Sequence, residues 1–299
     1  MNKTQLKNGL ADGLEDVQGR ADTRALPIQR VGVKRVKWPL AWAAEHGIVH
    51  SVAEFEMTVS LSAAQKGTHM SRFVAALNDA TDANTAFGAA PWSIAKARAF
   101  VADLQTRLEA DAAYFTCQFP LFLPRTAPVS GITSLMDYQL IISGSAQLQN
   151  GKVNTEIRLE IQAPVTSLCP CSKEISAYGA HNQRSHINIA ATIAASVADI
   201  AATAAASIAD TKKDTLTAET MIGWAESSAS AQLYPLLKRA DEKFVTEQAY
   251  DNPRFVEDLI REIALKAAAD PRAKNISVEA ENFESIHNHS AYAKLWIEA

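Results

Sequence analysis

The sequence predicts an α+β protein with an antiparallel sheet and helices on one face of that sheet. The order strand-strand-helix-helix-strand-strand occurs twice along the 299-residue chain. Several strand-length segments alternate apolar and polar residues, which is typical of strands with one buried face. An Asn150-Gly151 pair between the two cycles favours a hairpin, because both central positions of a type I′ turn need positive φ. Segregated strands and helices of this kind indicate an α+β architecture.

The first cycle contains two strands, two helices and two further strands. β-branched and aromatic residues alternate or cluster at strand length in four segments, and apolar residues recur at helical spacing in two others. In chain order these are strands over 31–38 and 54–61, helices from 69 and over 94–108, and strands over 114–123 and 136–148.

The second cycle follows the same order. Strands are expected over 153–164 and 186–196, and one helix over 218–237. The next helix is expected to open at Asn252-Pro253, a favoured pair for the first helical positions, and to end at Asp270-Pro271. Residues 275–281 alternate as a half-buried strand. The Ala-rich run 190–206 is expected to be a strand that continues into a loop or short helix.

The hairpin near Gly151 divides the chain into two expected ββααββ units, residues 26–150 and 151–299. The two units share a pattern of elements but no clear residue-level repeat. Residues 1–25 are polar and glycine-bearing, so they are expected to form a flexible or peripherally docked arm.

Composition excludes several classes of function. The chain is 47% hydrophobic, enough for a large core, and its formal net charge of −4 argues against a general binder of nucleic acid or anionic membrane. It has neither a signal-peptide core nor an uninterrupted apolar run of about 18 residues, so a cytoplasmic protein without a membrane span is expected. Three cysteines in a reducing compartment favour metal binding or catalysis over a structural disulfide.

Cys169, Cys171 and His181 form the most informative cluster. Thiolate and imidazole suit zinc, and a catalytic zinc needs only three protein ligands. Glu226 is the candidate third ligand, because a carboxylate beside an apolar helical face is costly unless it is paired or bound to metal. Glu242 lies among basic residues and is equally consistent with a surface ion-pair cluster. The alternative for the cysteines is a pair of loop thiols beside a hydrogen-bonded histidine.

Two further segments carry candidate site residues. In an extended chain His287 and His289 lie on one face with Ser285, whereas Glu284 points the other way unless the strand bulges or ends there. Histidines suit acid-base work near pH 7, although surface histidines near a chain end are common. The segment 66–73 combines a glycine and a helix start with three basic residues, which fits either a phosphate site or a capped helix with a solvated basic face.

Five separated motifs, in this order, resemble the type IB GTP cyclohydrolases, also called the GTP cyclohydrolase IV family. They are KGTHMSRF, SLCPCSKEIS, GAHNQRSHI, LKRADEKFVTE and FESIHNHSAYA, and the resemblance runs from about residue 28 to the C-terminus. It implies the tunnelling fold, in which ββααββ units assemble into barrels across subunits, with two units per chain. It also implies a homotetramer with active sites at subunit interfaces.

The resemblance implies conversion of GTP and water to 7,8-dihydroneopterin triphosphate and formate, the first step of folate-type pterin synthesis. One divalent metal per site, zinc, manganese or iron, would activate the water. The implied ligands are Cys169, His181 and Glu226. Other implied roles are proton transfer for His287, a less certain catalytic role for Glu242, guanine binding for Glu284, positions beside the site for the redox-sensitive Cys171 and for His289, and triphosphate binding for Lys66, His69, Arg72, Lys173 and Arg184.

Two alternatives remain open from the sequence. A nitrile reductase of the queuosine pathway has the same fold but uses its cysteine as a nucleophile, and would consume NADPH without releasing formate. A non-catalytic zinc-binding or redox module would use Cys169 and Cys171 as a switch and would not turn over GTP. None of these readings includes a nucleic-acid or membrane partner.

Overall fold

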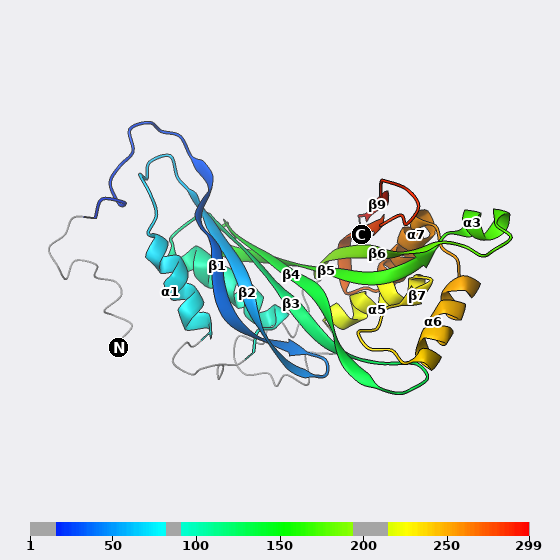
Figure 1. The fold of residues 1–299 in the computed structure, drawn as a ribbon. Helices are drawn as coiled ribbons and strands as arrows, with labels where there is room; N and C mark the ends of the chain where they lie inside the picture. Colours follow the sequence, from blue (N-terminus) through cyan, green and yellow to red (C-terminus); the bar gives the residue numbers. More distant parts are fainter. Residues whose placement is uncertain (1–15, 82–90, 194–214, 299) are drawn as a thin grey trace.

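The computed structural model describes residues 16–81, 91–193 and 215–298 (Figure 1). The expected N-terminal arm is therefore described only from residue 16, and the part of the Ala-rich run after Ile193 lies outside the described residues. Within them, no helix is long and apolar enough to span a membrane.

The strands form one antiparallel sheet with the order β1-β2-β3-β4-β5-β6-β8-β9. A short strand, β7, pairs with β5 away from this path. The bounds are β1 Ile28–Ala44, β2 Gly47–Leu61, β3 Ala112–Thr126, β4 Thr133–Gln149, β5 Lys152–Leu168, β6 Asn182–Ile193, β7 Ala231–Gln232, β8 Ala273–Asn282 and β9 Ala291–Ile297.

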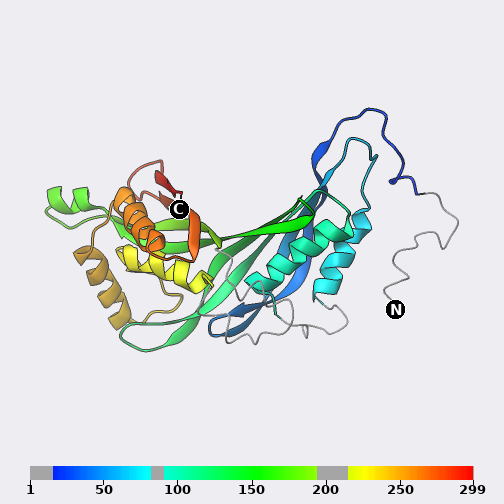
Figure 2. The ribbon, with the colours of Figure 1, turned by 180° about the vertical axis from the view of Figure 1, so that it is seen from behind.

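The helices lie on one face of this sheet, and Figure 2 shows them in front of it. Side chains alternate along the strands as expected: in β4, Met136, Tyr138 and Leu140 are buried, while the residues between them are more exposed. The predicted α+β class is confirmed. The helices are α1 Met70–Thr81, α2 Ile94–Arg107, α3 Pro170–Ile175, α5 Ala218–Ser228, α6 Arg239–Asp251 and α7 Val256–Ala268.

The turn between β4 and β5 has the predicted geometry. Asn150 has φ of 51° and Gly151 has φ of 75°, and Gln149 pairs with Lys152 across the turn. Positive φ at both central positions is the type I′ requirement. The hairpin places the expected unit boundary inside one continuous sheet.

The helix expected over 218–237 is wrong in its second half, because α5 ends at Ser228. The Ser227 and Ser228 hydroxyls donate to the carbonyls of Gly223 and Trp224, a local bond that competes with helix continuation. Ala231 then pairs with Thr166 on β5, so the chain becomes strand β7. The local sequence pattern favoured a longer helix, but this tertiary pairing overrides that preference.

The helices after α5 also differ from the prediction. Helix α6 was not expected, and α7 begins at Val256 after the N-cap residue Phe255 rather than at Asn252-Pro253. Asn252 instead donates from Nδ2 to the carbonyl oxygen of Ala229 at 2.8 Å. Its side chain therefore ties the α6–α7 connection to the end of α5.

Asp241 in the first turn of α6 joins the two halves of the chain. Its carboxylate is fully buried and accepts hydrogen bonds of 2.7–2.8 Å from the Ser130 hydroxyl and the backbone amides of Val129, Ser130 and Lys238. Burial opposes ionisation of this carboxyl group, but these hydrogen bonds hold its pKa well below the usual range. The β3–β4 turn is thereby fastened to α6.

Candidate active site

Cys169 lies in a tight turn between β5 and α3. It is the N-cap of α3, and its Sγ accepts a hydrogen bond from the Ser172 amide at 3.4 Å. Pro170 occupies the first turn of the helix, where a missing N–H costs nothing. The Cys169 amide donates to the His181 carbonyl oxygen at 3.1 Å, and the His181 amide donates to Ser172 Oγ at 3.3 Å. The backbones of Cys169 and His181 are therefore hydrogen-bonded to each other where this loop begins and ends.

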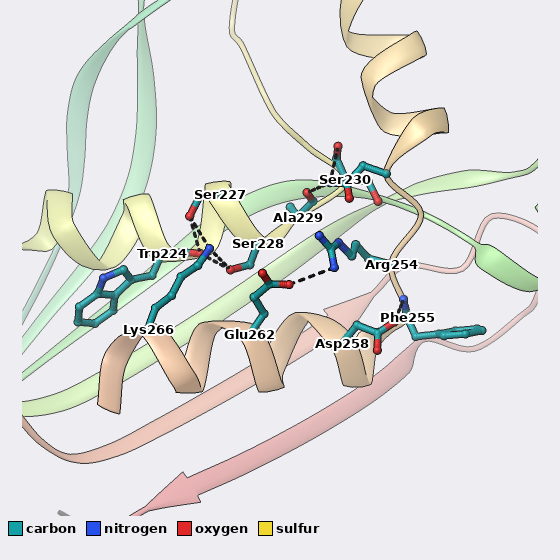
Figure 3. A network of polar contacts seen from close by, with 11 residues as sticks. Trp224, Ser227, Ser228, Ala229, Ser230, Arg254, Phe255, Asp258, Glu262 and Lys266 are labelled. Atoms are coloured by element: carbon teal, nitrogen blue, oxygen red, sulfur yellow. Dashed lines mark hydrogen bonds and ion pairs between the residues drawn. The ribbon is translucent and has the colours of Figure 1, made fainter. Parts of the chain in front are cut away.

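A buried polar network holds the chain just before Cys169. The Leu168 amide donates to Ser230 Oγ at 3.0 Å, and the Leu168 carbonyl oxygen accepts from the Arg254 amide at 3.0 Å. Arg254 is paired in turn with Glu262 at 3.0 Å (Figure 3). Both backbone polar groups of Leu168 are thus satisfied by the α5–α7 region, which sets the direction in which the chain enters the Cys169 turn.

Ser230→Ala is expected to lower the free energy of unfolding by about 1–3 kcal/mol, because it leaves the buried Leu168 amide without a partner. Under the metal hypothesis, affinity for metal should fall as well, because the Cys169 turn loses part of its support. Ser227→Ala is the matched control, because it removes a nearby serine hydroxyl that is exposed and bonded to Lys266 rather than to Leu168. Chemical denaturation and metal titration of both variants test this, and equal effects would contradict a specific role for Ser230.

The segment 283–290 is a loop, not the continuation of a strand. Strand β8 ends at Asn282 and β9 begins at Ala291, so the prediction of one extended segment through the histidines is wrong. Because β8 ends before Glu284, strand alternation no longer requires the Glu284 side chain to point away from Ser285 and the histidines. Gln183 Nε2 donates to Glu284 Oε1 at 3.3 Å, and Ser285 Oγ lies 3.3 Å from His181 Nδ1.

Gln183 is a site residue that the sequence reasoning missed. Its side chain is buried, and its Oε1 lies 3.0 Å from His181 Nδ1 while its Nε2 reaches Glu284. A hydrogen bond to this carbonyl oxygen requires the proton on Nδ1, which leaves Nε2 of His181 as the free ligand atom. His181 precedes β6, and Gln183 precedes the strand that was expected from residue 186, so periodicity gave no signal for this contact.

His287 and His289 stack on each other in this loop. Their ring centroids are 5.1 Å apart and the rings are inclined by 21°. Both side chains are exposed in the single chain. The loop therefore brings Ser285 to His181 and Glu284 to Gln183, and leaves both histidines exposed.

Glu226 has a different set of partners from the predicted one. Its carboxylate forms two hydrogen bonds with Arg125, of 3.1 and 3.2 Å, and accepts one from the Tyr138 hydroxyl. The pKa of Tyr138 is raised, mainly because its hydroxyl is buried and secondly because the Glu226 carboxylate lies beside it. In the described part of the chain, no three His, Cys, Asp or Glu side chains lie close enough to hold a metal ion. One chain therefore does not assemble Glu226 with Cys169 and His181.

The remaining candidates fall into two groups in the fold. Lys66 and His69 precede α1 and Arg72 lies in it, whereas Cys169 caps α3, and Figure 1 places these helices at opposite ends of the molecule. Near Cys169, Lys173 donates from Nζ to the Tyr250 carbonyl oxygen and lies 4.3 Å from the centroid of that ring. Three other candidates lie at this end: Arg184 at the start of β6, the exposed Cys171, and the exposed Glu242 in α6. The Arg184 carbonyl oxygen accepts a hydrogen bond from the Phe283 amide.

An open pocket of about 340 Å³ lies along α7. It is lined by Arg254, Asp258, Arg261, Glu262, Leu265 and Lys266. Figure 3 shows two of its basic side chains engaged within the chain, Arg254 with Glu262 and Lys266 with the Ser227 and Ser228 hydroxyls. None of the candidate site residues lines this pocket.

Comparison with known proteins identifies the family. Residues 14–293 match the family model described as type I GTP cyclohydrolase FolE2. The chain is 49% identical over 281 residues to the GTP cyclohydrolase FolE2 of Burkholderia ambifaria, covering 94% of this chain and 93% of that protein. It is 48% identical over 280 residues to the FolE2 of Ralstonia nicotianae, with the same coverage.

Solved structures show a likeness of fold. Urate oxidase from Bacillus sp. TB-90 superposes with a TM-score of 0.53 at 8% identity, covering 91% of this chain and all of that one. Urate oxidase from Bacillus subtilis gives a TM-score of 0.50 at 11% identity, covering 90% and 98% of the two chains. At such identities the likeness concerns the fold alone, which is the tunnelling fold. Together with the match across nearly the whole sequence, these findings show that the chain belongs to the type I GTP cyclohydrolase FolE2 family.

Proposed function

We propose that the protein is a GTP cyclohydrolase that converts GTP and water to 7,8-dihydroneopterin triphosphate and formate, at the entry to folate synthesis. The observation that carries this proposal is family membership over residues 14–293, with curated FolE2 relatives at 49% identity. The cluster of Cys169, His181, Gln183 and Glu284 supports it, because it joins a soft ligand pair to a carboxylate that can bind paired N–H donors.

The donor set of the Cys169 turn fits one divalent ion, with zinc, manganese or iron as candidates. Thiolate and imidazole are the ligands that zinc prefers, and Gln183 leaves Nε2 of His181 available. When bound, the ion would supply an activated water at neutral pH. Glu226 is the proposed third ligand, but it would have to leave its ion pair with Arg125 to reach the ion.

The other side chains have roles in binding and proton transfer. Glu284 would accept the N–H groups of the guanine edge, and His287 would move protons within the reacting ring system. His289 stacks on His287 and would hold that ring, while Glu242 would act near the site. Cys171, exposed two residues beyond Cys169, would be the redox-sensitive thiol.

The active site would be completed in a homo-oligomer, with a homotetramer as the proposed assembly. Lys66, His69 and Arg72 are the proposed triphosphate ligands of one chain, and Lys173 and Arg184 those beside Cys169. Because the two groups lie at opposite ends of one chain, a second copy would have to bring them together (Figure 1). Ile175 and Tyr178 beside Cys169 are 84% and 102% exposed, which supports burial of this end by another copy. The free state of all three cysteines supports a cytoplasmic location.

The proposed activity is tested with metal-stripped protein reconstituted with zinc or manganese. Incubation with GTP is expected to release formate and a pterin that fluoresces after oxidation, and only with metal present. Mass spectrometry of the product distinguishes the linear triphosphate from a cyclic phosphate. Absence of metal-dependent formate would contradict the proposal, and NADPH oxidation without formate would indicate a nitrile reductase instead.

A further inference from the structure

Residues 16–22 pack against the turn that precedes α1. The amides of Lys66 and Gly67 donate to the carbonyl oxygens of Arg20 and Gln18 at 3.0 and 3.2 Å, and the Asp22 amide donates to the Ala64 carbonyl oxygen at 3.0 Å. In Figure 1 this blue segment lies beside the cyan loop between β2 and α1. The amides of Lys66 and Gly67 are therefore already bonded within the chain.

The same segment places negative charge against the basic side chains of the turn. Asp16 Oδ2 lies 3.4 Å from Nε2 of His69. The Asp22 carboxylate is paired with Arg24, which lowers the pKa of Asp22 most, and the charge of Lys66 lowers it further. The Gly19 amide holds the Asp16 carboxylate from its other oxygen at 2.9 Å. The Asp16 carboxylate thus contacts His69 directly, and the Asp22 carboxylate, paired with Arg24, also interacts electrostatically with Lys66.

We propose that residues 16–22 are an intramolecular strap that occupies the triphosphate-binding turn and is displaced when the triphosphate of the substrate binds. The inference rests on the proposed function, because that function supplies the triphosphate. The strap offers groups of the kind that a triphosphate would offer, with the Asp16 carboxylate on His69 and carbonyl oxygens on the Lys66 and Gly67 amides. Binding and strap docking therefore compete for the same groups.

The contacts have the strength that a reversible strap needs. The Asp16 and His69 side chains are 52% and 29% exposed, and ion pairs in such surroundings are weak. Attachment to the same chain compensates for this weakness, because a tethered competitor has a high effective concentration at the turn. A multiply charged triphosphate that engages several cations at once can displace it.

The first test follows hydrogen exchange of the peptide covering residues 16–24 in the full-length protein. Inorganic tripolyphosphate and GTP are expected to accelerate exchange of this peptide, including the Asp22 amide, whereas guanosine is expected to leave it unchanged. Unchanged exchange with saturating tripolyphosphate would overturn the strap. The tripolyphosphate experiment needs no turnover, so it separates the two proposals. Formate release without faster exchange would contradict only the strap, and faster exchange without formate release would contradict only the cyclohydrolase activity.

The second test measures tripolyphosphate affinity of Asp16→Asn. Loss of the competing charge is expected to tighten binding about two- to fivefold, in keeping with the small energy of an exposed ion pair. Asp137→Asn, which makes the same charge change at an exposed position of β4, is the matched control and should bind as the wild type does. Weaker binding by Asp16→Asn would mean that the segment supports the site, and equal binding by both variants would mean that it does not compete.

Discussion

Replacing Cys169 with serine is expected to lower metal-dependent formate release by more than 100-fold. Loss of a partner that merely orients a ligand costs about 10–100-fold in metal affinity or activity, and loss of a ligand atom should exceed that range. Serine retains a side-chain oxygen that can cap α3 as Sγ does, so the turn should keep its structure. The effect would then report on the thiolate rather than on the helix cap.

Metal content per chain and activity at saturating metal are the measurements for this variant. Cys171→Ser is the matched control, since it makes the same chemical change two residues away at an exposed thiol. It is expected to retain metal and most activity, and to gain resistance to peroxide. Wild-type activity in Cys169→Ser would exclude a ligand role and would leave the motif as a structural turn.

Glu226→Gln is expected to destabilise the metal-free protein by about 3 kcal/mol. The Glu226 and Arg125 side chains are only 11% and 20% exposed, and removing one partner of a largely buried pair leaves the other charge uncompensated. Tyr138, which also donates to Glu226, would lose its charged acceptor. Chemical denaturation of the metal-free protein at fixed concentration measures the change.

This variant also separates the two roles of Glu226. Arg125→Met should be similarly destabilising, and the double variant Arg125→Met/Glu226→Leu should recover much of the loss, because an apolar pair can replace a buried ion pair. If metal content falls in Glu226→Gln while the metal-free stability is unchanged, the carboxylate is a ligand and its pairing with Arg125 is incidental. If stability falls and metal content does not, the ion pair is its function.

The Asn150-Gly151 hairpin and most of the strands could be predicted from the sequence because their signals are local. Positive φ at two neighbouring residues and alternation with a period of two do not depend on the rest of the chain. The helix expected over 218–237 was wrong for the opposite reason. Its end at Ser228 depends on β7 pairing with β5, a contact between residues more than 60 positions apart.

The candidate site divides in the same way. The motifs that contain Cys169, His181 and Glu284 were identified from residue types and from resemblance, and the fold does bring these segments together. Gln183 was missed because a neutral amide has no chemical signature of its own in a sequence. The partners of Glu226 could not be foreseen, because Arg125 and Tyr138 come from strands about 90 to 100 residues earlier.

The sequence by itself determined the α+β class, the Asn150-Gly151 hairpin and the Cys169–His181 motif, because these follow from periodicity, turn chemistry and ligand type. Only the tertiary structure decided that Glu226 pairs with Arg125, that Gln183 orients His181, and that residues 16–22 cover the turn before α1. Each of these depends on which distant side chains share a buried or crowded space. Hydrogen bonds and ion pairs select partners by position in space, and sequence separation does not limit them.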